Sequence, residues 1–291
     1  MRHIGIMQGR LLPSEDQRIQ CFPSRGWREE FSLAAAAGIE SIEWIYEAYG
    51  KLVNPVTSSE GVTEIRALSS RWGVSVVSLC ADILIDCPLF RGPKVDVRRS
   101  VGVVHWLLSR SREAGMERLV LPFVGANEVR TQQELEMAAG YIEEWAGEAE
   151  ALGVEIHLET SLDPRRFVWL LDRLPSHVVK VTYDIGNSVQ FGFDVREEMS
   201  AYGERVGSVH VKDSMRHGST VPLGDGEADF KYCFQYFASI GYQGDYVLQA
   251  ARLHDLDEVE LAKRYRAFIL SYLARSSTVD PQGLKGCTQP N

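Results

Sequence analysis

The sequence has few cysteines, and none of them form a recognisable pair. Five cysteines are scattered over 291 residues, and no C-x-x-C motif occurs. An odd number of widely spaced cysteines predicts neither a disulfide framework nor a cysteine-ligated zinc site. We therefore expect all of them to be reduced thiols.

Long apolar segments are also absent. No run of about 18 apolar residues occurs, which is the length that a membrane-spanning helix needs. The first residues, MRHIGIMQGR, lack the apolar core of a signal peptide. The sequence therefore predicts a cytoplasmic protein that does not enter a membrane.

Positive charge is in deficit. The chain carries 40 acidic and 31 basic residues, for a formal net charge of −9. A surface that follows a phosphate backbone needs an excess of lysine and arginine. Nucleic acid is therefore not an expected partner.

The sequence does contain short runs of β-branched and apolar residues that alternate with longer segments of helical periodicity. This alternation is typical of βα units. The strands are predicted at 4–8, 41–46, 74–80, 118–122, 154–159, 178–184, 206–211 and 246–249. Helices are predicted at 26–37, 61–72, 97–114, 132–152, 229–240 and 257–274.

Eight such units favour a closed barrel over an open sheet. No G-x-G-x-x-G follows the first strand, so an open dinucleotide-binding fold has no support. Four predicted helices end at a glycine, the residue that tolerates a left-handed helix end, namely Gly38, Gly73, Gly115 and Gly153. We predict a single (β/α)8 TIM barrel over residues 1–275 and a flexible C-terminal tail over 276–291.

Three of the later strands carry polar residues at every second position. One face holds Glu155, His157 and Glu159 in the fifth strand, Lys180, Thr182 and Asp184 in the sixth, and Ser208, His210 and Lys212 in the seventh. Parallel barrel strands are covered by helices on the outside, so these faces are predicted to point into the barrel.

Glu159, Asp184 and His210 stand at or near the carboxyl ends of these strands, where TIM barrels place their active sites. Buried ionisable groups are costly unless they are paired or bind a metal. Two carboxylates and an imidazole suit Mn2+, Mg2+ or Co2+, and Zn2+ is also compatible. A structural ion network is the alternative interpretation of the same three residues.

Several motifs of the chain resemble the xylose isomerase-like superfamily of sugar and sugar-phosphate isomerases and epimerases, which includes ketose 3-epimerases. They are HLET ending at Thr160, YDIGN ending at Asn187, VHVKD ending at Asp213, VPLGDGEADF ending at Phe230 and VLQAAR ending at Arg252. The resemblance extends over about residues 4–275. It implies a homo-oligomer, either a dimer or a tetramer.

The resemblance also implies four metal ligands, which are Glu159, Asp184, His210 and Gln249. At the last position the family usually has a glutamate, and this chain has an amide. Asn187 stands where the family pattern has a substrate-contacting histidine. Arg216 matches a family position that contacts substrate oxygens.

For chemistry, the resemblance implies a sugar, sugar phosphate or polyol ketone substrate and a divalent metal, with Mn2+ as the first expectation. The substrate would pass through a cis-enediolate held by the metal, with Glu159 as the base. An amide at Gln249 cannot accept a proton, so a one-base aldose–ketose isomerisation is favoured over 3-epimerisation. Glu43 or Asp82 is a candidate replacement base.

Further substrate contacts are predicted around the barrel mouth. Gln8 after the first strand, Glu43 near the end of the second and His157 in the fifth are predicted substrate contacts. Lys212 or His157 is also expected behind Arg216.

The sequence does not decide whether the substrate carries a phosphate. If it does, Arg10 or the backbone of the turn 224–226 is the expected binding site.

Three other functions compete with this hypothesis. A metal-dependent dehydratase of an inosose or dehydroshikimate type would need an acid such as His217 or His254. The departures at Gln249 and Asn187 also fit a catalytically weakened sugar-binding relative. An abasic-site endonuclease is disfavoured by the acidic balance and by having only seven histidines.

Overall fold

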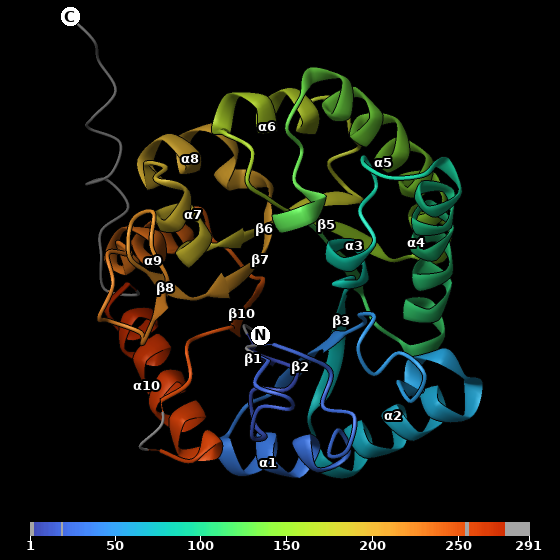
Figure 1. The fold of residues 1–291 in the computed structure, drawn as a ribbon. Coiled ribbons are helices and arrows are strands. Elements are labelled where there is room, and N and C mark those ends of the chain that lie inside the picture. The colour runs from blue at the N-terminus through green and yellow to red at the C-terminus, as the bar shows by residue number, and fades with distance from the viewer. Residues whose placement is uncertain (1–2, 19, 254–255, 277–291) are drawn as a thin grey trace, which may run out of the picture.

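The eight predicted strands form a closed parallel barrel in the computed structural model, which describes residues 3–18, 20–253 and 256–276. Around the barrel the order is β1-β10-β7-β6-β5-β4-β3-β2. Helices surround the strands on the outside (Figure 1). The strands are β1 (Ile4–Met7), β2 (Ser41–Ile45), β3 (Ser75–Cys80), β4 (Arg118–Phe123), β5 (Glu155–Thr160), β6 (Val179–Asp184), β7 (Val206–Val211) and β10 (Asp245–Leu248).

The predicted helices are present, with ends that differ by a few residues. The helices are α1 (Glu29–Ala37), α2 (Ser59–Trp72), α3 (Ile83–Asp86), α4 (Lys94–Ala114), α5 (Gln132–Leu152), α6 (Pro164–Leu171), α7 (Ile185–Phe191), α8 (Val195–Tyr202), α9 (Phe230–Ser239) and α10 (Glu258–Ser276). Short 3-10 turns are η1 (Pro55–Thr57), η2 (Gly125–Asn127) and η3 (Gly203–Arg205). The TIM-barrel prediction is therefore confirmed. The predicted tail beyond Ser276 lies outside the described residues. His254 lies outside them as well.

The connection after β7 contains a small hairpin that was not predicted from the sequence. Strands β8 (Asp213–Ser214) and β9 (Thr220–Val221) pair antiparallel to each other, apart from the barrel. Strands of two residues are too short to show an alternating pattern, which explains why they could not be predicted.

The four helix-ending glycines adopt the backbone conformation that was expected of them. Gly38, Gly73, Gly115 and Gly153 have φ angles of 71°, 65°, 78° and 66°. Each helix therefore ends in the left-handed region, where a side chain would be strained. These ends turn the chain from each helix into the next strand.

Most of the apolar core lies between the strands and the helices. Trp44 on β2, for example, packs against the rings of Phe22, Trp27 and Phe31. A smaller apolar cluster contains one residue from each of the first four strands and from β10. Its members are Met7, Ile45, Cys80, Val120 and Val247. The rest of the barrel interior is therefore available to polar side chains.

The polar faces of β5, β6 and β7 do meet inside the barrel, as their alternation predicted. Ser208 Oγ lies 2.8 Å from His157 Nδ1 and 2.9 Å from Thr182 Oγ1. All three side chains are buried. Beneath them, Lys180 Nζ contacts Glu155 Oε1 at 2.5 Å, with about a third of each side chain exposed. Polar side chains of β5, β6 and β7 thus occupy this side of the barrel interior, from the ends that carry Glu155 and Lys180 toward the carboxyl ends.

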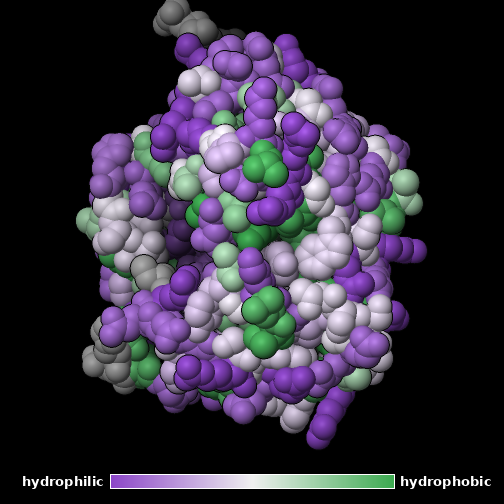
Figure 2. Space-filling model, turned by 45° about the vertical axis from the view of Figure 1, so that its right-hand side comes forward, coloured by the Kyte–Doolittle hydropathy of each residue, from purple (hydrophilic) through white to green (hydrophobic). Residues whose placement is uncertain are grey.

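No helix among the described residues is long and apolar enough to cross a membrane. The face drawn in Figure 2 is mainly hydrophilic, and hydrophobic residues appear on it in small separate groups.

Candidate metal and catalytic site

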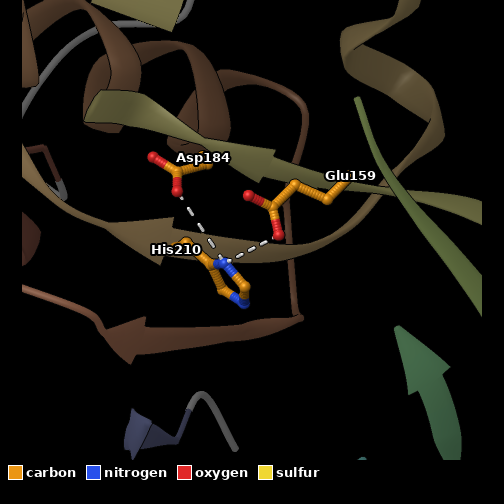
Figure 3. A group of neighbouring side chains, drawn as sticks. All are labelled: Glu159, Asp184 and His210. Carbon is orange, nitrogen blue, oxygen red and sulfur yellow. Dashed lines mark ion pairs between the residues drawn. The ribbon is translucent and has the colours of Figure 1, made fainter. Parts of the chain in front are cut away.

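Glu159, Asp184 and His210 converge at the carboxyl ends of β5, β6 and β7. One ligand atom from each lies within 4.8 Å of the other two. His210 Nδ1 is 3.6 Å from Glu159 Oε2 and 4.0 Å from Asp184 Oδ2. Both carboxylates point toward this ring nitrogen (Figure 3). The three residues predicted from strand alternation are therefore brought together.

The His210 ring is oriented by Glu43. His210 Nε2 lies 2.7 Å from Glu43 Oε1, and Ser78 Oγ donates to the other Glu43 oxygen at 2.7 Å. An imidazole that donates from Nε2 presents the lone pair of Nδ1, as metal-ligating histidines do. Glu43 was predicted as a substrate contact or replacement base. Both of its oxygens are bound by protein partners in this structure, and its role toward the substrate stays a prediction.

The site contains buried polar atoms without hydrogen-bond partners, and these are the atoms that a cation needs. His210 Nδ1 has none, and Asp184 Oδ2 accepts no hydrogen bond. Lys212 Nζ is 2.7 Å from Asp184 Oδ2, but this ion pair lacks hydrogen-bond geometry. Ligand atoms at about 2.1 Å from one ion are about 3 to 4 Å apart. The two separations from His210 Nδ1, 3.6 and 4.0 Å, fall in this range.

The charges of the site also favour a bound cation. Burial raises the pKa of Glu159 to about 7. Burial opposes the charged form of His210, but Glu43, Glu159 and Asp184 outweigh it and raise the pKa of His210 to about 9. Without a cation, protons bound to Glu159 and His210 would thus reduce the net negative charge of the trio. A divalent ion would displace these protons and balance the carboxylates.

Asn187 and Gln249 both lie beside the trio. Asn187 Nδ2 donates to Glu159 Oε1 at 2.6 Å, and the Asn187 N–H donates to Asp184 Oδ1 at 2.8 Å. Asn187 therefore fixes one oxygen of each carboxylate. The Gln249 oxygen is 3.5 Å from Lys212 Nζ. Gln249 thus connects to the trio through the lysine that pairs with Asp184.

Gln8 and Arg216 do not join the trio. Gln8 has no exposed surface, and its Oε1 accepts from the Ile45 N–H at 3.0 Å. Gln8 therefore packs against β2, and its predicted substrate contact stays a prediction. The exposed Arg216 side chain donates to the Gly192 carbonyl at 2.8 Å. That contact directs its guanidinium to the loop after α7.

The predicted phosphate cradle in the turn 224–226 is already filled by the protein. The N–H groups of Gly224, Gly226 and Ala228 all donate to the Asp213 carboxylate, at 2.9, 3.0 and 3.2 Å. A phosphate would have to displace this internal anion, so the prediction was wrong. The other candidate, Arg10, donates to the Ala250 carbonyl at 3.0 Å and to Gln20 at 3.2 Å.

His157 belongs to the layer beneath the site. Its two ring nitrogens lie against Ser208 Oγ at 2.8 Å and Glu155 Oε2 at 2.9 Å, and its side chain is fully buried. Both nitrogens are thus occupied by protein partners, and its predicted substrate contact stays untested. His157 supports the strands that carry the trio.

We expect His157 to make the protein less stable in mild acid. Burial lowers the pKa of His157 to about 4, from an ordinary value of 6.5. Between these values the unfolded chain binds a proton that the folded protein does not, so the free energy of unfolding falls as the pH falls. Urea denaturation at pH 7 and pH 4.5 should show a loss smaller by about 2 kcal/mol in His157→Gln. Equal losses in the two proteins would contradict this role.

The sequence profile of the xylose isomerase-like TIM barrel matches residues 31–268. This match covers most of the chain and includes all three residues of the trio. The chain belongs to this family. The resemblance stated from its motifs is therefore confirmed.

A curated relative within this family is L-ribulose-5-phosphate 3-epimerase UlaE of Salmonella paratyphi A. It is 24% identical over 268 residues, which are 87% of this chain and 92% of the relative. The similarity thus extends over nearly the full length of both proteins.

Solved structures share the fold at low sequence identity. An L-ribulose 3-epimerase aligns with a TM-score of 0.76 and 19% identity over 95% of this chain and 96% of its own. The IOLI protein, solved with a zinc atom, aligns with a TM-score of 0.76 and 12% identity over 95% of this chain and 100% of its own. These structures support the barrel that the strand order defines.

Proposed function

We propose that this protein is a divalent-metal-dependent epimerase or isomerase of a small ketose or ketose phosphate, with Glu159 as the base. The observation that carries the proposal is the convergence of Glu159, Asp184 and the unpartnered Nδ1 of His210 within 4.8 Å. The relative that acts on L-ribulose 5-phosphate supports the substrate class. The zinc-containing neighbour supports a metal.

Glu159, Asp184 and His210 would hold the cation, with Mn2+ as the first candidate, followed by Mg2+, Co2+ and Zn2+. When bound, the ion supplies a Lewis acid that stabilises negative charge on substrate oxygens. Glu159 then removes a proton from the carbon next to the substrate carbonyl. Asn187 holds Glu159 Oε1 at 2.6 Å, so the carboxylate keeps one orientation during the transfer.

Proton exchange followed by NMR in heavy water tests this function. The purified protein would be given Mn2+, Co2+ or Mg2+ and a panel of ketopentoses, ketohexoses, inososes and their phosphates. We expect deuterium at the carbon next to the carbonyl of at least one ketose, together with its epimer or its aldose. Loss of water from the substrate would identify a dehydratase. Stabilisation by a sugar without exchange would identify a binding protein, and either result overturns the proposal.

We expect Glu43→Gln to weaken metal binding while leaving the fold intact. The variant retains a hydrogen-bond acceptor for His210 Nε2 but loses the charge that strengthens His210 as a ligand. Loss of such a supporting carboxylate typically costs 10- to 100-fold in metal affinity, and the Mn2+ dissociation constant would measure this. Glu47→Gln, which removes another buried carboxylate from the loop after β2, is the control. Equal Mn2+ affinity in both variants would contradict a specific role for Glu43.

A further inference from the structure

We propose that Glu198, on α8, is a positioning residue for the metal site. It holds the end of β6, which carries Asp184, and the first turn of α7, which carries Asn187. This inference rests on the proposed function and adds to it a residue that acts through others.

The first turn of α7 holds both carboxylates of the trio. Asp184 precedes this helix as its N-cap, and its Oδ1 accepts from the Asn187 N–H at 2.8 Å. The Asn187 side chain donates to Glu159 Oε1 at 2.6 Å. A shift of this turn would therefore move one oxygen of each carboxylate.

Helix α7 is too short to keep this position by itself. It has 7 residues, and isolated helices shorter than about 12 residues are marginal in water. A cavity of about 20 Å³ is lined by residues of β5, β6, α7 and α8, including Glu159, Asn187 and Glu198. Because packing is incomplete there, directed contacts are needed to fix the helix.

Glu198 supplies directed contacts to both segments. Helix α8 lies beside α7 (Figure 1). Tyr183 OH donates to Glu198 Oε2 at 2.9 Å, and Ser188 Oγ donates to the same oxygen. Tyr183 directly precedes Asp184, and Ser188 directly follows Asn187. One carboxylate oxygen thus ties the residue before Asp184 to the residue after Asn187.

The other Glu198 oxygen binds within its own helix. Tyr202 OH donates to Glu198 Oε1 at 2.7 Å, and both residues belong to α8. Glu198 and its three hydroxyl donors are all buried. The two oxygens therefore have separable roles: Oε2 anchors the segments of the metal site, whereas Oε1 stabilises α8.

Paired tyrosine variants test this assignment through the Mn2+ dissociation constant. Tyr183→Phe and Tyr202→Phe each keep the ring and remove one buried hydroxyl from the same carboxylate. We expect the melting temperatures of the two ion-free variants to fall by similar amounts. The Mn2+ dissociation constant should rise about 10-fold in Tyr183→Phe and stay within about 2-fold of the wild-type value in Tyr202→Phe.

Three further variants distinguish positioning from a general loss of stability. Ser188→Ala removes the link to α7 and should weaken Mn2+ binding as Tyr183→Phe does. Glu198→Gln keeps an oxygen for Tyr183 and Ser188, so it should retain the Mn2+ affinity that Glu198→Ala loses. The visible absorption of bound Co2+, which reports ligand geometry, should change in Tyr183→Phe and Ser188→Ala but not in Tyr202→Phe.

Other results would overturn the assignment. Equal Mn2+ affinity in Tyr183→Phe and Tyr202→Phe, whether near the wild-type value or reduced in both, would make the role of Glu198 structural only. Should Glu198→Ala fail to fold, the tyrosine pair decides alone. Wild-type protein that binds no divalent ion would instead remove the metal site of the proposed function, so the two failures are distinguishable.

Discussion

Glu159→Gln is expected to lower both isotope exchange and product formation by about 1000-fold, even with saturating metal. The amide can still offer an oxygen to a cation, but it cannot accept the proton from the substrate carbon. We do not expect Asp184 to replace it, because Asp184 accepts from the Asn187 N–H and pairs with Lys212. Initial rates and deuterium uptake by NMR would measure the loss.

Glu155→Gln is the matched control for this prediction. Glu155 lies on the same face of β5 but at the opposite end, where it pairs with Lys180. We expect this variant to lose some stability and to retain most of its activity. A Glu159→Gln variant that keeps more than about a tenth of the wild-type rate would show that the base lies elsewhere.

Removal of divalent ions by a chelator is expected to abolish activity and to lower the melting temperature. The trio brings two buried carboxylates to an imidazole, and a cation relieves their repulsion. An ion present at about 100 times its dissociation constant adds about 2.7 kcal/mol to the free energy of unfolding. Thermal unfolding with chelator, and again after addition of Mn2+, Co2+, Mg2+ or Zn2+, would measure the effect and rank the ions.

The variant His210→Ala provides the control for chelation. It lacks the imidazole, so its melting temperature should no longer respond to added ions. Wild-type protein that keeps its activity and its melting temperature after complete removal of ions would contradict a role for metal in this site.

The sequence predicted the barrel and the trio because both depend on local patterns. Strand β5 shows its inward face through Glu155, His157 and Glu159, and the ends of parallel strands meet at one rim of a barrel. These rules place Glu159 beside Asp184 and His210 without any knowledge of side-chain contacts. The family resemblance led to the same residues independently.

Contacts between distant segments could not be predicted in this way. Glu43 binds His210 across 167 residues of sequence, and no local pattern distinguishes it from a carboxylate that faces substrate. The Asp213 carboxylate accepts hydrogen bonds from the N–H groups of the turn 224–226. These N–H groups are therefore not free to bind a phosphate. No local pattern predicted the contact of Gln20 with Arg10, because Gln20 is a single polar residue in the loop after β1.

The amide at Gln249 favours a one-base isomerase, whereas the curated relative is named as a 3-epimerase. Product analysis with both epimers decides between these reactions.

Metal binding by the trio is tested most directly by equilibrium dialysis against Mn2+, comparing the wild-type protein with Asp184→Ala. We expect about one ion per wild-type chain and a loss of at least 100-fold in affinity in the variant, because a buried charged ligand is removed. Wild-type protein that binds no ion, or a variant that binds Mn2+ as tightly as the wild type, would contradict it.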